Sequence, residues 1–398
     1  MKMIDITKFD CIVVGAGFCG SVIARKLAEY GKKILILERR NHIAGNMYDE
    51  IDSNGILVQK YGPHIFHTKN KKVFEFITKY DTWIDYHLQV AVEMNGIISP
   101  SPINYKTIDL FYDKEDACTL KAHLETRYSG QKAVTILELL DCDDTIIKQY
   151  AEKLYEMNYR PYTVKQWGIS PEEIDPSILK RVPVRMDYTN AYFDDEFQCM
   201  PKNGYTCFFK NLLSHNNIEV QLNTDALDTL KADTEKKQLL FEGNSISIPV
   251  VYTGAIDEML EYRYGQLPYR SLRFDYQTKN VDSFQEAPLV THPKAEGYTR
   301  TTEYKKLPSQ NIPEITTVVY EYPIPADKTS GNEPYYPVLT DNNTTLYNRY
   351  LHDLQNIPNL FLCGRLADYK YYNMDNAILR AFDVYKIIQQ EYLRARQI

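Results

Sequence analysis

The sequence has no long apolar run. None of its segments approaches the ~18 consecutive apolar residues of a membrane-spanning helix. The first ten residues lack a positively charged stretch followed by an apolar one, so we expect neither secretion nor membrane insertion. Basic runs are missing as well, and the net charge is −7. Nucleic acid is therefore not an expected partner.

Cysteine is present but forms no recognisable pattern. The seven cysteines include no C-x-x-C pair and no metal-ligand spacing, which is typical of a reducing compartment and predicts a cytoplasmic protein without a metal site. Tryptophan is scarce, with 2 copies, whereas tyrosine has 33. A tyrosine-rich cleft suits stacking on a nucleobase and hydrogen bonding to sugar or phosphate oxygens, although most of the tyrosines should be structural.

The most informative segment is residues 10–38, FDCIVVGAGFCGSVIARKLAEYGKKILILE. An apolar strand runs into a G-x-G-x-x-G turn, and a helix, a second strand and an acid follow in order. In this arrangement Gly15 allows the tight turn, Gly17 lets the backbone approach a pyrophosphate, and Gly20 permits close packing of helix and strand. The helix N-terminus offers free N–H groups to phosphates, and Glu38 would hold a ribose. The segment predicts an adenine-dinucleotide site.

The residues after Glu38 favour FAD over a nicotinamide cofactor. The chain continues as Arg39-Arg40-Asn41-His42-Ile43-Ala44-Gly45-Asn46, which is similar to the E-x-R-x-x-x-G-G continuation of FAD enzymes of the glutathione reductase type. Near the C-terminus an apolar strand at 359–363 ends in Gly364-Arg365, where such flavoproteins return to the pyrophosphate. Alone, that pair could be an ordinary turn at the end of a strand.

The rest of the chain interrupts this nucleotide-binding fold. A length of 398 residues favours two or three domains. Alternation around Asn95-Gly96 predicts a hairpin, residues 107–182 resemble successive helices with breaks at Pro161 and Pro176, and residues 270–323 alternate like antiparallel strands. We predict an α/β protein with a Rossmann-like FAD-binding domain (1–85, 199–262 and 338–398), a helical substrate domain (106–184) and an antiparallel β-sheet domain (86–105, 185–198 and 263–337).

Six motifs resemble the bacterial UDP-galactopyranose mutases. They are Lys60-Tyr-Gly-Pro-His64-Ile-Phe-His67-Thr, Tyr162-Thr-Val-Lys-Gln-Trp167-Gly, Lys180-Arg181-Val-Pro-Val-Arg185, Tyr298-Thr-Arg300, Glu333-Pro-Tyr335-Tyr336-Pro and Gly364-Arg365-Leu-Ala-Asp-Tyr369-Lys-Tyr371-Tyr372-Asn373-Met374. Their order along most of the chain is hard to attribute to chance.

The resemblance implies an isomerase that converts a nucleotide-diphosphate hexose between pyranose and furanose without net redox change. In that family N5 of reduced FAD attacks the anomeric carbon and expels the nucleoside diphosphate; the flavin-sugar adduct then opens, recloses through the 4-hydroxyl and recovers the diphosphate. The side chains position the sugar and hold the diphosphate. The furanose product would supply a cell-surface polysaccharide. A homodimer is a further expectation from the family.

The resemblance also assigns residues. Arg181 and Arg300 match diphosphate-binding arginines, although either could form a surface ion pair. Tyr192, Tyr336 and Tyr371 match phosphate-binding tyrosines, and Tyr162 and Trp167 match aromatics at the nucleobase and sugar; without the motifs each would be read as a core residue. The segment from Trp167 to Arg181 would be a mobile loop that closes over substrate.

Further assignments concern the sugar and the flavin. His64 and His67 match a histidine pair beside the isoalloxazine; their spacing lacks a third metal ligand, so a packed or hydrogen-bonded pair is the alternative. Asn104 should reach the sugar and Asn373 should lie near the phosphates. The candidate cofactor-binding residues are Gly15, Gly17, Phe18, Gly20, Glu38, Arg39, Gly45, Asn46, Gly364, Arg365 and Met374.

One departure from the family pattern leaves the substrate open. Before Tyr162 the family often has an aromatic or aliphatic residue followed by Ile/Val-Lys-Gly, whereas this chain has Asn158-Tyr159-Arg160-Pro161. A smaller, polar Asn158 could accommodate the 5-methyl of thymine, so dTDP-fucopyranose is an alternative to UDP-galactopyranose, unless the substitution is neutral. Retention of His67 argues mildly against UDP-N-acetylgalactosamine.

Two other functional classes share some of these features. An FAD-dependent amine or sugar oxidoreductase would have the same dinucleotide fingerprint, but it would not need paired arginines and a tyrosine cluster for a diphosphate. A nucleotide-sugar binding protein without catalysis is the second alternative. The requirement for reduced flavin and the trapping of substrate on it would discriminate between these classes.

Overall fold

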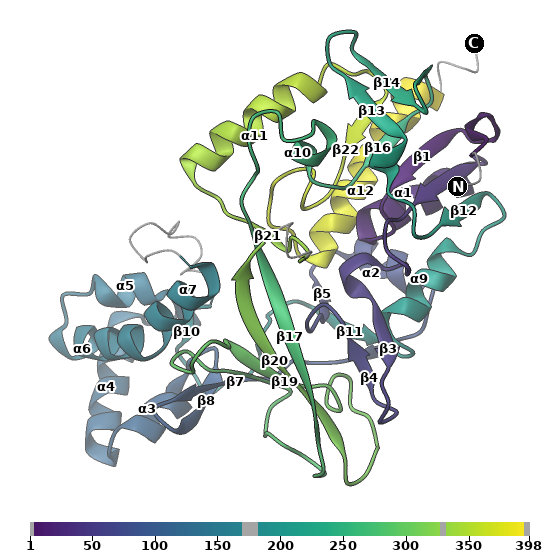
Figure 1. The fold of residues 1–398 in the computed structure, drawn as a ribbon. Coiled ribbons are helices and arrows are strands. Elements are labelled where there is room, and N and C mark those ends of the chain that lie inside the picture. Colours follow the sequence, from purple (N-terminus) through teal and green to yellow (C-terminus); the bar gives the residue numbers. More distant parts are fainter. Residues whose placement is uncertain (1–3, 169–181, 327–331, 394–398) are drawn as a thin grey trace.

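The computed structural model describes residues 4–168, 182–326 and 332–393 (Figure 1). Its first domain is built on a five-stranded parallel sheet. The strands, in spatial order, are β12 (Ile218–Gln221), β2 (Ile34–Leu37), β1 (Cys11–Val14), β16 (Val250–Tyr252) and β22 (Leu360–Leu362). All four pairings in this sheet are parallel. Segments from three distant parts of the sequence thus form one sheet, as the predicted discontinuous domain requires.

Both faces of this sheet are covered, which explains the continuous apolar character of its strands. On one face Val13, Ile34 and Ile36 pack against helices α1 (Phe18–Glu29), α9 (Tyr205–Leu213) and α12 (Met374–Ile388). On the other face Ile12 and Leu35 pack with α10 (Ile256–Met259), α11 (Asp341–Leu354) and a small sheet. That sheet comprises β13 (Leu230–Asp233), β14 (Gln238–Phe241) and β15 (Asn244–Ile246).

Several short elements complete this domain. Two further small sheets belong to it. One pairs β3 (Asp49–Ile51) with β4 (Leu57–Gln59), and the other contains β5 (Phe66–Thr68), β11 (Phe197–Pro201) and β6 (Trp83–Asp85). The helical elements are α2 (Lys71–Thr78), the 3-10 turns at Ile6–Lys8, Gly45–Met47 and Ala226–Asp228, and the π-helix at Gln389–Leu393. Within the described ranges, no helix combines the length and apolar character needed to cross a bilayer.

The second domain is a seven-stranded sheet with a long central ribbon (Figure 1). Its order is β21 (Tyr336–Pro337), β17 (Tyr269–Lys279), β20 (Thr316–Pro325), β19 (Arg300–Glu303), β18 (Leu289–Thr291), β7 (Val90–Met94) and β8 (Ile97–Ser101). The pairings are antiparallel except β7 with β18, which is parallel. The predicted hairpin is confirmed: Asn95 and Gly96 both have positive φ, as a two-residue turn between β7 and β8 requires.

The third unit is helical and lies apart from the parallel sheet (Figure 1). It contains α3 (Tyr105–Phe111), α4 (Lys114–Arg127), α5 (Ile136–Leu140), α6 (Thr145–Leu154), a π-helix at Tyr155–Tyr159 and α7 (Arg160–Trp167). The predicted break at Pro161 is wrong. The helical path continues from Thr145 to Trp167 because Pro161 stands in the first turn of α7, directly after the π-helix, where proline is tolerated. Pro176 lies outside the described residues.

The sequence-derived boundaries need one change. Residues 185–198, which we assigned to the antiparallel sheet, give no strand to it: β10 (Val184–Arg185) pairs with β9 (Ala133–Val134) of the helical unit, and β11 pairs with β5 and β6. A strand of two residues, or one that starts in a polar loop, has too few alternating apolar residues for the sequence to indicate which strand it pairs with. The predicted fold class, a Rossmann-like domain with helical and antiparallel β insertions, is confirmed.

Candidate active site

The glycine-rich turn after β1 is shaped by backbone contacts that leave no room for side chains. Gly15 has a φ of +98°, and a Cβ placed there would lie 2.2 Å from the hydroxyl oxygen of Thr253. A Cβ at Gly20 would lie 2.0 Å from the carbonyl oxygen of Gly15. The predicted roles in the tight turn and in close helix packing therefore match the geometry.

Gly17 is different, because the space beside it is open. Its φ of −80° suits any residue, and the nearest heavy atom to an added Cβ is the Cα of Gly45 at 3.8 Å. Gly17 is the N-cap of α1 and makes no side-chain capping bond, so the first N–H groups of the helix remain available to an anion.

Glu38 is held firmly at the end of β2. Its carboxylate accepts one hydrogen bond from the N–H of Ala16 (2.8 Å) and one from the N–H of Arg40 (2.9 Å), and the residue is only 5% exposed. A carboxylate oxygen accepts more than one bond, so Glu38 is oriented and retains acceptor capacity. Its position fits ribose binding, and the turn fits a dinucleotide pyrophosphate.

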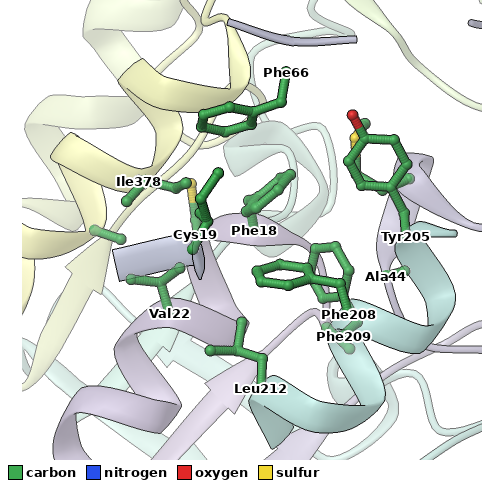
Figure 2. Packing of buried hydrophobic residues seen from close by; sticks show 14 of the residues in the cluster. Phe18, Cys19, Val22, Ala44, Phe66, Tyr205, Phe208, Phe209, Leu212 and Ile378 are labelled. Atoms are coloured by element: carbon green, nitrogen blue, oxygen red, sulfur yellow. The ribbon is translucent and has the colours of Figure 1, made fainter. Parts of the chain in front are cut away.

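The side chain of Phe18, a predicted cofactor residue, is buried in the core. Its ring lies in the core beneath the turn, 4.9 Å from the ring of Phe209, 6.0 Å from Phe208 and 6.4 Å from Phe66 (Figure 2). The side chain is 7% exposed. The apolar residue in the motif thus anchors the first turn of α1 to α9 and β5.

The two arginines after Glu38 form ion pairs. Arg39 contacts Glu258 (3.3 Å) and Glu333 (3.0 Å), and Arg40 contacts Glu333 (2.9 Å). Arg40 also donates to the side-chain oxygen of Asn46 (3.0 Å). Arg39, a predicted cofactor residue, therefore has acidic partners of its own, and Glu333 joins the dinucleotide turn to the segment that carries Tyr336.

Arg365 organises the other edge of the site. Its guanidinium lies over the rings of Tyr336 (5.3 Å) and Tyr371 (5.1 Å), which are stacked on each other with centroids 5.7 Å apart. It also donates to the carbonyl of Tyr372 (2.6 Å). Just beyond, Asn373 is the N-cap of α12; its side chain makes no capping bond, and Met374 is the first residue of the helix. The predicted return of the chain to the nucleotide turn is seen at Gly364, where an added Cβ would lie 3.3 Å from the sulfur of Cys19.

Arg300 lies on β19 against a buried acid. Its Nε donates to Oε2 of Glu321 at 2.8 Å, and Glu321 is 3% exposed. Burial by itself lowers the pKa of Arg300, but Glu321 and the hydroxyls of Tyr162 and Tyr336 raise it, and the net pKa lies above the usual value. Arg300 is thus a permanent cation held in place by a carboxylate, rather than a surface ion pair.

Tyr162 is close to Arg300 and to Tyr192. Burial raises the pKa of Tyr162, while the nearby Arg300 opposes the shift and Tyr192 and Tyr336 add to it. Residues from α7, β19, β21 and the 182–196 segment therefore meet here. Arg181 and the 169–181 part of the predicted loop lie outside the described residues, as does the side chain of Trp167.

His64 interacts with the charges of both Arg300 and Arg365. Burial and the charges of Arg365 and Arg300 lower its pKa to about 3, against the opposing hydrogen bond from its Nδ1 to the carbonyl of Gly62 (2.8 Å). The imidazole is therefore neutral at ordinary pH, and because its Nδ1–H donates to the Gly62 carbonyl, its Nε2 is left as an acceptor.

The low pKa of His64 predicts a specific pH dependence of stability. Between pH 3 and 6.5 the unfolded chain binds a proton at this residue and the folded chain does not, so the free energy of unfolding falls as the pH falls, by at most ~1.4 kcal/mol per pH unit. In urea unfolding across this range, we expect the H64Q variant to have a flatter profile. The matched control is H352Q, a substitution of an exposed histidine on α11, and it should retain the wild-type slope. Equal slopes for all three proteins would contradict the burial argument.

His67 has a different environment from His64. Its Nδ1 hydrogen-bonds to the carboxylate of Asp195, and its ring stacks on Phe193 with centroids 3.7 Å apart. In the described ranges, no group of three or more His, Cys, Asp or Glu side chains is arranged to hold a metal ion. His67 is thus packed and hydrogen-bonded, which was the alternative interpretation of the histidine pair.

Two of the predicted asparagines, Asn104 and Asn158, differ in exposure. Asn104 is fully buried: its Oδ1 caps α3 by accepting from Lys106 N–H (2.9 Å), and its amide donates to Thr189 O (3.1 Å) and Asn190 Oδ1 (2.8 Å). Its amide group is therefore engaged in holding α3 against the 187–190 segment. Asn158 is partly exposed in the π-helix, four residues before Tyr162.

Comparison with known proteins gives this arrangement a family. A family model described as UDP-galactopyranose mutase matches residues 157–371, more than half of the chain, and one described as NAD(P)-binding Rossmann-like domain matches residues 13–80. The chain belongs to the UDP-galactopyranose mutase family. It is a nucleotide-sugar pyranose/furanose mutase, an isomerase, with a Rossmann-like dinucleotide-binding domain.

Relatives of this mutase act on more than one sugar. It is 36% identical to the UDP-galactopyranose mutase of Mycoplasma pneumoniae over 95% of this chain and 96% of that protein. It is 35% identical to a dTDP-fucopyranose mutase of Escherichia coli, with 94% of this chain and 96% of that protein covered. A crystal structure of reduced UDP-galactopyranose mutase superimposes with a TM-score of 0.72 at 15% identity, covering 97% and 94% of the two chains, which supports the fold.

Sequence reasoning missed three residues of the mutase site that act through ionic or hydrogen-bonded contacts. Glu321 holds Arg300, Asp195 holds His67, and Glu333 holds Arg39 and Arg40. Glu333 stands in a quoted motif but had no role there. The signal that could have identified Glu321 is its place in an otherwise apolar strand segment, because a buried carboxylate needs a cationic partner.

Proposed function

We propose that this mutase converts UDP-galactopyranose to UDP-galactofuranose and back, with reduced FAD as its cofactor. The observation that carries the proposal is the gathering of Arg300, Arg365 and the stacked Tyr336 and Tyr371. Cations and hydroxyl groups are the groups that bind and stabilise a diphosphate. The residues that would hold the cofactor beside this cluster are Gly17, Glu38 and His64.

The residues present fit FAD on grounds other than the family. Gly17 leaves an open path along the free N–H groups of α1, and Glu38 presents an oriented carboxylate one strand away. When bound in its reduced form, FAD supplies the nucleophile for the anomeric carbon. The protein's part is to hold the hexose carbon in line and to exclude water.

The side chains divide the remaining work. Arg300, fixed by Glu321, stabilises the charge that develops on the diphosphate as its bond to the anomeric carbon breaks, and Tyr336 and Tyr371 hold the same oxygens. We propose Arg181 as a second cation, and Tyr162, Tyr192 and Trp167 as contacts to the nucleotide and sugar. Neutral His64 and the Asp195-held His67 would orient the sugar and the flavin. Because the leaving group stays bound, it can return to the same carbon after the ring recloses.

A second substrate has a specific observation in its favour. Asn158 lies about one helical turn before Tyr162, on the same side of a continuous helical run, and it is small and polar. A nucleobase beside Tyr162 would then meet an amide rather than a bulky apolar group. dTDP-fucopyranose is therefore the alternative substrate, and a 35% identical relative has that name.

The test is turnover by dithionite-reduced protein, followed by chromatography of the nucleotide sugars. UDP-galactofuranose, dTDP-fucopyranose and UDP-N-acetylgalactosamine are incubated separately with reduced and with oxidised enzyme. We expect conversion of UDP-galactofuranose to the pyranose by the reduced enzyme alone. Conversion of dTDP-fucopyranose instead would favour the alternative, and N158L should then shift the preference towards the uridine nucleotide. Equal turnover by the oxidised enzyme would contradict the proposed cofactor state.

A further inference from the structure

Lys165 makes an unusual set of contacts at the end of α7. Its ammonium donates to the backbone carbonyls of His292 (2.9 Å) and Tyr298 (2.9 Å) and also to that of Ala295. A lysine has three N–H groups and no acceptor, so all its donors are used. The three acceptors belong to the single turn that joins β18 to β19.

These contacts do not form a surface ion pair. Among the described residues no carboxylate lies within ion-pair distance of the Lys165 ammonium, which is matched with neutral carbonyl dipoles. The residue is partly buried, so its ammonium loses part of its hydration on folding, which costs free energy. The three carbonyl groups of the turn replace that hydration only in this arrangement. This cost points to a positional role.

The acceptor turn is itself ordered. His292 donates its backbone N–H to Thr299 O (2.7 Å), and Ala295 donates to His292 O (3.3 Å). The rings of His292 and Tyr298 contact edge to face, with centroids 5.1 Å apart. The three carbonyls therefore form a preformed cradle for one ammonium, and two residues later the chain reaches Arg300.

Lys165 also has a fixed relation to the site on its own helix. Tyr162 lies three residues earlier on α7, which places the two side chains on neighbouring positions of one helix face. Tyr162 interacts with Arg300 on the facing strand. One lysine thus ties the helix that carries Tyr162 to the turn that leads into Arg300.

We propose that Lys165 is a positioning residue of the mutase: it sets the spacing between Tyr162 and Arg300 by tying α7 to the β18–β19 turn, without touching substrate. The proposal rests on the proposed roles of Arg300 and Tyr162. Loss of this tie moves the aromatic contact and the leaving-group cation relative to each other. A displacement of about 1 Å in such a pair lowers the rate on the order of a hundredfold.

The tie has a pH dependence because a neutral amine has one N–H fewer. Burial lowers the pKa of Lys165 to about 8, whereas the three carbonyl acceptors favour the charged form, so loss of the tie should begin at or above pH 8. The charged and titratable groups around the turn are His292, Lys294, Glu296 and Tyr298 on the turn itself, Glu93 on β7, Tyr320 and Tyr322 on β20, Glu156 in the π-helix and Arg160 at the start of α7.

The experiment compares kcat and KM of the flavin-loaded wild type, K165M, K165R and the matched control K153M from pH 6 to pH 10. Lys153 lies on the preceding helix, and the contacts of its ammonium are the rings of Phe111 and Tyr112. We expect K165M to lose about ten- to a hundredfold in kcat/KM, with lower kcat and higher KM, while K153M stays at the wild-type value. K165R, which cannot lose its charge, should lack the alkaline decline of the wild type.

The outcomes separate this inference from the proposed function. Wild-type kinetics in K165M, or a lower melting temperature with unchanged kcat and KM, would overturn the positioning role and leave the function intact. A fully active R300A, measured in parallel, would instead overturn the assigned site. If K165M does not fold, the comparison of wild type and K165R above pH 8 decides: identical profiles contradict the inference.

Discussion

Replacing Arg300 with alanine should lower kcat/KM of the reduced enzyme about a thousandfold, because the diphosphate loses the cation that stabilises its developing charge. The flavin content should not change, since Arg300 lies on the sheet domain and not at the glycine-rich turn. The measurement is steady-state turnover of the accepted nucleotide sugar, together with the visible absorbance of the purified protein.

The buried partner of Arg300 requires a second variant. R300A leaves Glu321, which is 3% exposed, without its cation, and an uncompensated buried charge costs about 3–5 kcal/mol. R300K keeps the charge but removes the planar guanidinium that donates from two nitrogens to Glu321, so it should fold more stably and still lose much of the activity. Thermal unfolding of each variant separates a loss of catalysis from a loss of structure.

Arg273 provides the matched control. It lies exposed on β17 of the same sheet, separated from β19 by β20, and its guanidinium stacks on Tyr322 at 3.9 Å. R273A removes a similar side chain from the same sheet and should remain within about twofold of wild-type activity, since surface substitutions are typically near neutral. If R300A were as active as R273A, the diphosphate would not bind at Arg300.

The elements that could be predicted are those whose local sequence pattern matches their burial or backbone conformation in the folded protein. The strands Cys11–Val14 and Ile34–Leu37 are buried on both faces, so their continuous apolar runs indicated both of them. The turn at Asn95-Gly96 was equally clear, because positive φ at two successive residues strongly favours this pair. The motif residues Tyr336, Tyr371 and Arg365 lie against one another, and Tyr336 is close enough to Arg300 to influence its pKa; their binding roles stay predictions.

Other features could not be predicted because they depend on residues far apart in the chain. Arg39 and Arg40 form ion pairs with Glu333, nearly three hundred positions away, so a motif-based assignment of Arg39 to the cofactor had no way to include that partner. Asn104 is an N-cap whose amide also reaches Thr189. Pro161 does not end the helix because a π-helix precedes it, and such a turn has no clear signal in sequence.

A substitution at Gly17 of the dinucleotide turn should separate cofactor binding from folding. G17A places a methyl group in open space 3.8 Å from Gly45, with an allowed φ of −80°, so the apoprotein should lose no more than about 1 kcal/mol of stability. The same methyl enters the path proposed for the pyrophosphate. Overpacking by one methyl typically costs ~1–3 kcal/mol, which corresponds to about a ten- to hundredfold weaker binding of FAD.

Gly20 and Gly31 are the comparison sites. G20A would bring a methyl within 2.0 Å of the Gly15 carbonyl, so it should reduce both stability and flavin content. G31A has no atom within 4 Å of the added methyl but strains a φ of +83°; it should lower stability by about 1 kcal/mol and keep its flavin. The checks are apoprotein unfolding in urea and FAD titration. Normal FAD affinity in G17A would mean that the pyrophosphate does not pass this residue, because no other contact in the turn is altered by the change.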